Sequence, residues 1–219
     1  MQNLKGVYVA LATPTDKNGE IDLKTLESFV DYLITDGGVQ GIIPLGSTGE
    51  YYALNDSEKN EITRVVLETA AKRVPVLIGT NSGGTREVIR LSQTAQNAGA
   101  QGVLLAPPYY SLPTRAELYD HFKSVNDAID LPIMLYNYPA RTGVDLTPDL
   151  VEELADLKNV AYVKESTGES ARVSEIIQRC GDKIDVFCGS DGIAFESLML
   201  GSVGWVAGVA NVIPHEHVK

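Results

Sequence analysis

The amino-acid sequence predicts an α/β protein of the (β/α)8 TIM-barrel class, formed as one domain over residues 1–219. Short apolar segments rich in Val, Ile and Leu alternate with amphipathic segments, and eight such alternations occur without a change in composition along the chain. Apolar segments of this kind are typical of parallel strands joined by crossover helices. Eight repeats of the unit favour a closed barrel over an open, doubly wound sheet.

Each expected strand is an apolar run that ends in polar residues. The eight runs cover residues 6–14, 41–46, 74–80, 102–108, 132–139, 160–167, 184–191 and 204–211.

The segments between the strands carry ordinary helix start signals. Asp22 and Asn55 precede amphipathic stretches, and Thr147 precedes Pro148, which is favoured in the first helical turn. Apolar residues at spacings of three and four mark the faces that we expect to pack on the barrel. One such stripe contains Leu26, Phe29, Val30 and Leu33.

The segment after the eighth expected strand is short. Only VIPHEHVK, residues 212–219, follows it, which is too little for an eighth outer helix. We therefore expect the eighth outer helix to be missing and an apolar flank of the barrel to be left for a partner, or for a longer form of the chain, to cover.

Composition and charge narrow the function classes. The chain is 44% hydrophobic and carries 18 Lys and Arg against 29 Asp and Glu, a net charge of −11 without a basic cluster. This balance disfavours nucleic acid and anionic membranes as partners. No targeting segment and no run of eighteen apolar residues occurs, so we expect a cytoplasmic protein. Cys180 and Cys188 lack the spacing of a zinc site, and no metal is expected.

The carboxyl ends of the strands are where barrel enzymes place their chemistry. Lys164 ends the apolar run NVAYVK and is followed by a polar turn, so its amine should lie at the barrel mouth. A site of low dielectric constant would lower the pKa of this lysine and supply the neutral amine that attacks a ketone. The alternative is a structural lysine that extends to solvent.

Polar groups at other strand ends could serve such a lysine. The turn GSTGE at residues 46–50 offers backbone N–H groups and the hydroxyls of Ser47 and Thr48 to a carboxylate. Tyr136 and Tyr110 could relay protons, and Arg141 could bind a second carboxylate. The alternatives are a plain β-to-α turn, packing aromatics and a surface ion pair.

Five segments, in this order and spacing, give the chain a resemblance to the dihydrodipicolinate synthase and N-acetylneuraminate lyase family of pyruvate-dependent class I aldolases. The resemblance runs from residue 6 to about residue 214. The segments are GSTGE at 46–50, PPYYSLPT at 107–114, YNYPARTG at 136–143, VKESTG at 163–168 and GSDG at 189–192.

The resemblance implies a role for each matching residue. Lys164 matches the lysine that forms the Schiff base, and Tyr136 matches the tyrosine that moves protons to and from the carbinolamine. Ser47 and Thr48 match the pair that receives the carboxylate of pyruvate, and Arg141 matches the arginine that binds the second substrate. Gly189 and Val206 match positions lining the bound keto acid. The catalytic residues that the resemblance implies are Lys164, Tyr136, Thr48 and Tyr110, and the implied substrate-binding residues are Ser47, Thr48, Arg141, Gly189 and Val206.

The resemblance also implies an assembly and a reaction without a cofactor. In this family the tyrosine matching Tyr110 comes from the neighbouring subunit, which implies a homodimer, usually paired into a homotetramer. The implied reaction is that of a lyase or aldolase, in which an enamine formed from pyruvate or another 2-oxo acid attacks an aldehyde such as aspartate semialdehyde. Relative to the family, the chain lacks the eighth outer helix and a C-terminal helical region.

Departures from each branch of the family leave the second substrate open. Synthases of the lysine precursor commonly have two threonines where this chain has Ser47 and Thr48, and an asparagine at Ser111. N-acetylneuraminate lyases generally lack an arginine at the position that matches Arg141. The first alternative is therefore an aldolase or dehydratase of 2-keto-3-deoxy sugar acids or an N-acetylneuraminate lyase-like enzyme, and an enzyme acting on hydroxyproline-derived imino acids belongs with it. A keto-acid-binding barrel without turnover and a phosphate-binding barrel with GSDG as its turn are the others.

Overall fold

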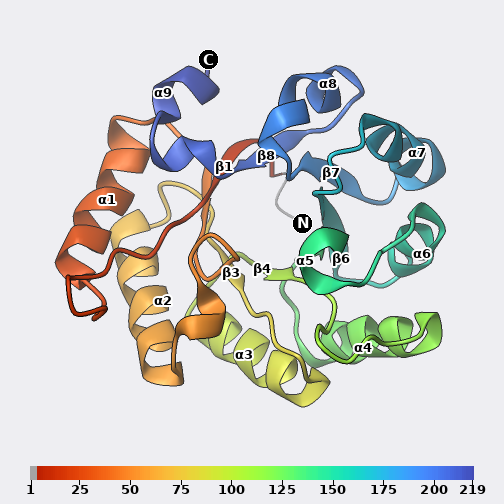
Figure 1. Ribbon diagram of the computed structural model, residues 1–219, viewed down its shortest axis with the longest axis horizontal. Coiled ribbons are helices and arrows are strands. Elements are labelled where there is room, and N and C mark those ends of the chain that lie inside the picture. Colours follow the sequence, from red (N-terminus) through yellow and green to blue (C-terminus); the bar gives the residue numbers. More distant parts are fainter. Residues whose placement is uncertain (1–3) are drawn as a thin grey trace.

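A ring of strands forms the centre of the structure, and helices surround it (Figure 1). The structure is a computed structural model that describes residues 4–219. In these residues eight strands form one parallel sheet in the order β2-β1-β8-β7-β6-β5-β4-β3. The strands are β1 Gly6–Ala10, β2 Gly41–Ile43, β3 Leu77–Gly79, β4 Gly102–Leu105, β5 Ile133–Asn137, β6 Val160–Glu165, β7 Asp185–Cys188 and β8 Gly204–Ala207.

The two edge strands of this order, β2 and β3, meet and close the ring. Ile42 and Val76 form a parallel bridge, Ile42 N donates to Pro75 O at 3.1 Å, and Gly79 N donates to Pro44 O at 3.0 Å. The predicted barrel class is thus confirmed, and each strand lies inside the range expected from the sequence.

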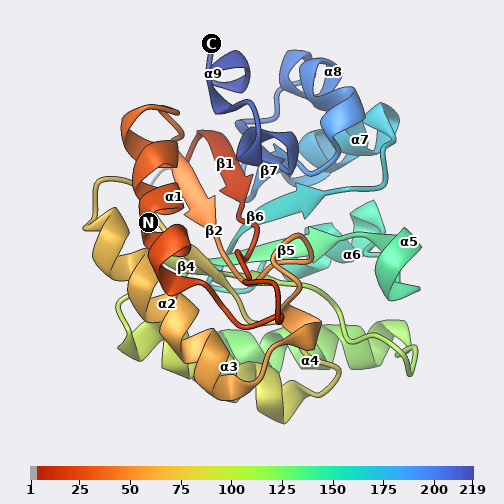
Figure 2. The same cartoon turned by 60° about the vertical axis from the view of Figure 1, so that its left-hand side comes forward.

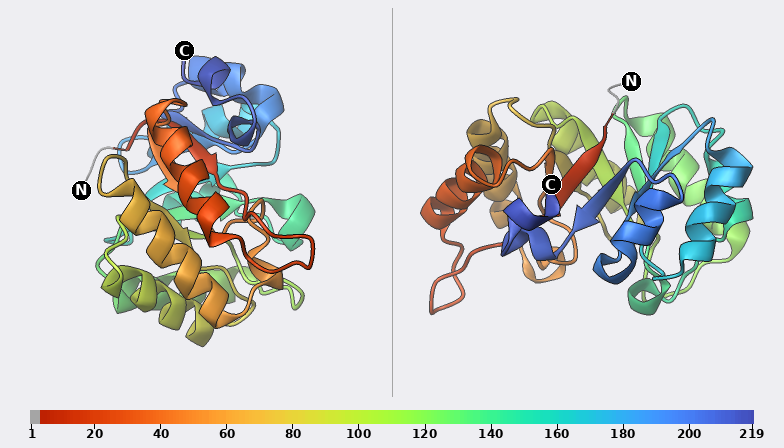
Figure 3. Two further views of the ribbon diagram at one scale, coloured as in Figure 1. Left: turned by 90° about the vertical axis from the view of Figure 1, so that its left-hand side faces the viewer. Right: turned by 90° about the horizontal axis from the view of Figure 1, so that it is seen from above.

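Helices follow the strands in alternation and pack on the outside of the ring (Figures 1 and 3). The α-helices of the described residues are α1 Leu23–Thr35, α2 Asp56–Ala70, α3 Thr85–Asn97, α4 Arg115–Ala128, α5 Pro139–Thr142, α6 Pro148–Leu154, α7 Ser170–Cys180, α8 Ala194–Met199 and α9 Pro214–His217. Short 3-10 helices are η1 Tyr51–Ala53, η2 Asp191–Ile193 and η3 Val209–Asn211.

Two of the predicted helix starts carry a side-chain cap, and the third begins with a proline. The side chain of Asp22 accepts from Thr25 N, and Asn55 forms a reciprocal capping box with Glu58. Pro148 occupies the first turn of α6, as expected. Each cap satisfies backbone N–H groups that the first helical turn leaves without partners.

The chain after β8 forms η3 and the four-residue α9, where the barrel pattern has an outer helix. The segment lies between α1 and α8, as Figure 1 and the right view of Figure 3 show. His217 packs its ring against Trp205 of β8 at 4.7 Å between centroids, and His215 contacts Tyr32 of α1 at 6.4 Å.

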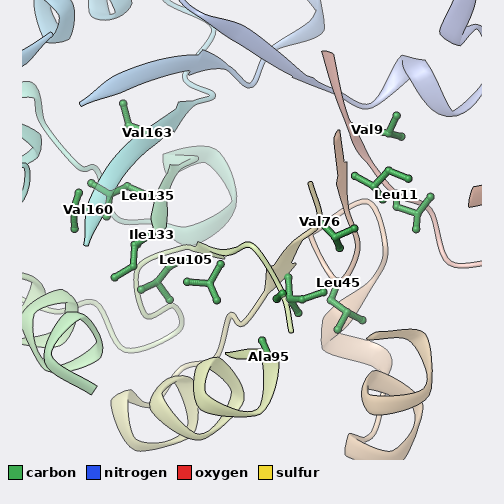
Figure 4. Close-up of a cluster of buried hydrophobic side chains, with 14 of the residues drawn as sticks. Val9, Leu11, Leu45, Val76, Ala95, Leu105, Ile133, Leu135, Val160 and Val163 are labelled. Atoms are coloured by element: carbon green, nitrogen blue, oxygen red, sulfur yellow. The ribbon is translucent and has the colours of Figure 1, made fainter. Parts of the chain in front are cut away.

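Two hydrophobic layers form the core. The larger lies between the strands and the helices and includes Val9, Leu105 and Leu135 (Figure 4). The smaller fills the inside of the barrel, where Phe187 packs edge to face against Tyr8 and Tyr162, with centroids 5.3 and 5.9 Å away. This aromatic layer closes the interior, so the barrel is a packed core rather than a channel.

Two glycines make room for the inner aromatic layer. A Cβ atom on Gly41 would lie 2.0 Å from the ring of Tyr8, and one on Gly204 would lie 2.4 Å from the ring of Phe187. Each of these large side chains therefore lies beside a glycine on the neighbouring strand, which lets the interior reach native packing density.

Candidate active site

Lys164 lies on the inner face of β6, at the carboxyl end of the strand. Side chains alternate along a strand, so Tyr162 and Lys164 face the barrel interior while Val163 and Glu165 face the helices. The side chain of Lys164 is buried, with 6% of the residue exposed. Its Nζ atom lies 4.1 Å from the ring centroid of Tyr136, the residue paired with it on β5.

Burial changes the protonation of this lysine. Loss of solvation lowers the pKa of Lys164 to about 8, and the nearby groups of Asp191 and Cys188 partly oppose the decrease. With a pKa near this value, roughly one amine in ten is neutral at pH 7, far more than for a lysine in water. The prediction of a lysine with a lowered pKa at the barrel mouth agrees with this geometry.

A cavity of about 300 Å³ opens above Lys164 and brings together all the predicted site residues except Tyr110. Its volume suits a three-carbon keto acid with a further small substrate. The cavity is lined by Ala10, Ser47, Thr48, Tyr136, Tyr138, Arg141, Lys164, Ser166, Gly189, Ser190, Asp191, Val206 and Gly208.

The turn after β2 presents unpaired backbone donors to this cavity. Gly49 N and Glu50 N are used inside the turn, where they donate to Gly46 O and Ser47 O at 3.1 and 3.2 Å. Among residues 4–219, no hydrogen bond uses the amides of Ser47 and Thr48. These two N–H groups and the adjacent hydroxyls can therefore receive a carboxylate without a formal positive charge.

The hydroxyl of Tyr136 stands between this turn and the lysine. The pKa of Tyr136 is raised by burial, and the hydroxyl of Ser47 partly offsets this by hydrogen bonding. Tyr136 therefore keeps its proton near neutral pH, which suits a group that donates and recovers a proton during a reaction.

Arg141 lies on α5, directly beyond the end of β5. In Figure 2 the arrow of β5 points toward α5, which projects from that side of the barrel. The guanidinium carbon of Arg141 lies 5.9 Å from the ring centroid of Tyr138. In the part of the chain that the structure describes, Arg141 forms no ion pair, so its guanidinium is available to a carboxylate in the cavity.

Gly189 at the end of β7 leaves the space that the lysine occupies. A Cβ atom at this position would lie 1.9 Å from Ser166 Oγ and 2.8 and 2.9 Å from Lys164 Cγ and Cε. A side chain at position 189 would thus displace Lys164 or Ser166. Val206 completes this part of the wall from β8.

Tyr110 is the predicted site residue that does not line the cavity. It is 98% exposed and lies in the loop between β4 and α4 with a φ of 78°, a left-handed backbone conformation that a tyrosine rarely adopts. The prediction that it acts in a neighbouring subunit stays a prediction.

Sequence reasoning missed part of the site. Ala10 and Gly208 line the cavity but have no polar side chain that could have indicated them, whereas Ser166 and Asp191 follow strand ends and could have been assigned from that position. A second cavity of about 200 Å³ adjoins the first and shares Ser47, Tyr136, Tyr138 and Arg141 with it. Its other lining residues are Tyr51, Tyr52, Asn81, Ala106, Tyr109 and Thr142.

Residues 4–219 contain no group of three His, Cys, Asp or Glu side chains placed to hold a metal ion. None of their helices is long and apolar enough to cross a membrane.

Known proteins are similar to this chain over nearly its whole length. A relative named 4-hydroxy-tetrahydrodipicolinate synthase, from Geotalea daltonii, is 44% identical over 212 residues, which are 97% of this chain and 72% of the relative. A chloride-inhibited dihydrodipicolinate synthase from Acinetobacter baumannii, solved with pyruvate, superimposes with a TM-score of 0.97 at 37% identity, covering 99% of this chain and 74% of that one.

A third solved structure is also similar over most of the chain. It is described as the first monomeric dihydrodipicolinate synthase variant, and it matches with a TM-score of 0.94 at 35% identity over 98% of this chain and 72% of its own. The family model described as "Dihydrodipicolinate synthetase family" matches residues 3–219. The chain therefore belongs to the dihydrodipicolinate synthetase family, an enzyme family of class I aldolases and lyases that work through a Schiff base.

Proposed function

We propose that this chain acts like 4-hydroxy-tetrahydrodipicolinate synthase, condensing pyruvate, held as a Schiff base on Lys164, with an aldehyde such as aspartate semialdehyde. The observation that carries the proposal is the placement of Lys164. Its amine is buried, has a pKa near 8, and faces a cavity that also holds two free backbone amides and an unpaired arginine.

The geometry supports a defined order of steps. The neutral Nζ adds to the keto carbon of pyruvate, and the resulting carbinolamine loses water to form an iminium, with Tyr136 donating the proton that the departing hydroxyl needs. The iminium draws electrons from the methyl group, so a methyl proton passes to the Tyr136 phenolate and an enamine forms, and the phenol can then give this proton to the aldehyde oxygen. The enamine carbon then attacks the aldehyde carbon, whose oxygen gains a proton. The amino group of the semialdehyde then attacks the new iminium carbon, which closes the ring as an imine, breaks the bond to Nζ and releases Lys164, while the proton lost passes to the Tyr136 phenolate.

The two carboxylates of the substrates fit different parts of the cavity. The amides and hydroxyls of Ser47 and Thr48 suit the carboxylate of pyruvate, because they lie beside Tyr136 at the floor of the site. Arg141 lies beyond the strand ends and suits the carboxylate of the second substrate. Since the protein carries a net charge of −11, such local groups have to supply the attraction for both anions.

Reduction with borohydride in the presence of pyruvate tests the proposal. We expect a lactyl adduct on Lys164, located by peptide mass spectrometry, and no adduct in the Lys164→Met variant. Lys158→Met changes an exposed lysine and serves as the matched control that keeps the adduct. An unmodified Lys164 under these conditions would contradict the proposal.

Turnover with different second substrates separates the synthase from its alternatives. We expect consumption of aspartate semialdehyde with pyruvate to exceed cleavage or dehydration of 2-keto-3-deoxy sugar acids. A sugar acid consumed faster than aspartate semialdehyde would assign the chain to the other branch. Adduct formation with no turnover of any compound would favour a keto-acid-binding barrel.

We also propose that Tyr110 serves the site of a second copy of the chain in a homodimer, which could pair further into a tetramer. Two observations support this: Tyr110 is 98% exposed on a strained loop, and the cavity of the same chain lacks it. Backbone strain in an exposed loop is typical of positions held for function.

Mixing two inactive variants tests this assembly. Lys164→Met supplies an intact Tyr110, and Tyr110→Phe supplies an intact Lys164. If Tyr110 acts across the interface, a mixed dimer contains one complete site, and activity returns on mixing. Failure to recover activity, together with the mass of a monomer by light scattering, would contradict the proposal.

A further inference from the structure

The residues directly behind the site form a buried polar network. Tyr136 and Lys164 pair on the inner face of β5 and β6, and the next pair in the same register, Asn137 and Glu165, faces outward. Asn137 is 0% and Glu165 1% exposed, and Asn137 Nδ2 donates to Glu165 Oε2 at 2.9 Å. The proposed chemistry uses neither residue.

The network extends from these two residues to the loop that carries Arg141. This loop, residues 138–146, is called the Arg141 loop below. Asn137 Nδ2 also donates to Asp145 Oδ1 at 3.1 Å, and Leu146 N donates to Asn137 Oδ1 at 2.9 Å. The backbone of Asn137 thus leads directly into the Arg141 loop, and its side chain binds the far end of the loop. One residue is therefore attached to both ends.

An arginine on a third element completes the network. Arg172 of α7 contacts both oxygens of Asp145, with Nη1 3.1 Å from Oδ1 and Nη2 3.0 Å from Oδ2. This paired geometry fixes direction as well as distance. The ion pair is largely shielded from solvent, with 17% of the Arg172 side chain and 35% of the Asp145 side chain exposed.

The second carboxylate of the network is that of Glu165, which lies on β6 next to Lys164. Glu165 Oε1 accepts from Thr167 N at 2.7 Å, and its backbone oxygen accepts from Gly189 N at 2.7 Å. Every polar atom of Asn137 and both oxygens of Glu165 are therefore paired. A fully paired buried network is rigid, whereas a partly paired one is costly.

We propose that Asp145, Asn137, Glu165 and Arg172 are positioning residues, which hold the Arg141 loop against the strand of Lys164 and so set where the second substrate binds. This inference rests on the proposed function for its substrate. The network affects one part of the site only. Ser47 and Thr48, which are proposed to bind the carboxylate of pyruvate, lie on a different turn that the network does not contact.

Kinetics of the Asp145→Ala variant test the inference. We expect the KM for aspartate semialdehyde to rise at least fivefold, while the KM for pyruvate changes by less than twofold. Arg172→Met should also raise the KM for aspartate semialdehyde without changing the KM for pyruvate. This second variant can be measured if Asp145→Ala folds poorly. Asp149→Ala is the matched control, because Asp149 also pairs with an arginine, Arg115, but does so on the surface.

Hydrogen exchange supplies a readout that does not depend on turnover. We expect amides of the Arg141 loop to exchange at least tenfold faster in both variants, while amides of β6 are unchanged. Equal rises in both KM values, or unchanged exchange in the loop, would overturn the inference. Absence of the borohydride adduct in the unmodified protein would instead overturn the proposed function, and the exchange experiment would still decide whether the network holds the loop.

Discussion

Lys164 Nζ lies 4.1 Å from the ring centroid of Tyr136, and the two residues are paired in the register of β5 and β6. The amine and the phenol are therefore held by the same pair of hydrogen-bonded strands. Their relative position depends on the sheet rather than on a loop, which is the kind of support that precise catalytic geometry needs.

Replacing Tyr136 with Phe should leave the ring beside Lys164 and remove the hydroxyl alone. Proton transfer by a placed side chain typically contributes about 10²- to 10⁴-fold, so we expect kcat to fall within this range while the borohydride adduct still forms, more slowly. Steady-state kinetics and the rate of adduct formation measure the two effects. Tyr119→Phe, on α4, is the control, and a kcat within threefold of the unmodified protein would refute the role of the hydroxyl.

Gly189→Ala should disable the site without unfolding the barrel. The new methyl group would lie 1.9 Å from Ser166 Oγ and within 3 Å of two carbon atoms of Lys164, so the lysine has to move. A displacement of about 1 Å can reduce a rate about 10²-fold. We expect a loss of this size in adduct formation.

Gly192→Ala is the matched control for this change. It lies three residues further along, and a Cβ atom there has no neighbour within 4 Å. Adduct formation in this variant should stay within twofold. Equal effects of the two substitutions would show that the crowding at position 189 is not the cause.

Replacing Lys164 with Met should abolish activity and stabilise the fold near neutral pH. Burial lowers the pKa of Lys164 to about 8 from 10.5, so below pH 8 the folded protein has to keep a buried ammonium. By linkage the penalty is on the order of 1 to 3 kcal/mol. Between pH 8 and 10.5 the unfolded chain binds the proton and the folded chain does not, so stability of the unmodified protein rises with pH.

Urea unfolding at several pH values measures this effect. The gain in unfolding free energy of Lys164→Met over the unmodified protein should be largest below pH 8 and shrink as the pH approaches 10.5. A gain that does not depend on pH would indicate a packing effect rather than the removal of a buried charge.

Asp191→Asn should shift the pH dependence of Schiff-base formation. The carboxylate of Asp191 raises the pKa of Lys164 against the effect of burial. Without this charge the amine becomes neutral at lower pH, so the acidic limb of the rate profile should move to lower pH. The asparagine oxygen can still accept from Trp205 Nε1 and Gly208 N, whereas the hydrogen bond from Val209 N to the second carboxylate oxygen is lost.

Rates of adduct formation between pH 5 and 9 would reveal this shift. Glu196→Gln removes an exposed carboxylate on α8 and should leave the profile unchanged. A shift of the limb to higher pH in Asp191→Asn would contradict the electrostatic role given to Asp191.

Much of the fold is determined by local sequence. The eight apolar runs, the caps at Asp22 and Asn55 and the proline at the start of α6 each act within one element, and all are present in the structure. Lys164 could be assigned to the barrel mouth for the same reason, because the last inward residue of a strand needs only the strand and its direction.

The tertiary structure alone decided which residues meet on neighbouring strands. Gly41 faces Tyr8 and Gly204 faces Phe187, and Asn137 joins Glu165 to the far end of the Arg141 loop. These contacts depend on the tilt and register of strands far apart in sequence, and periodicity within one strand carries no information about them. The sequence by itself determined the elements and the lysine at the barrel mouth, whereas closure of the ring determined the pKa of this lysine, its cavity and the polar network behind it.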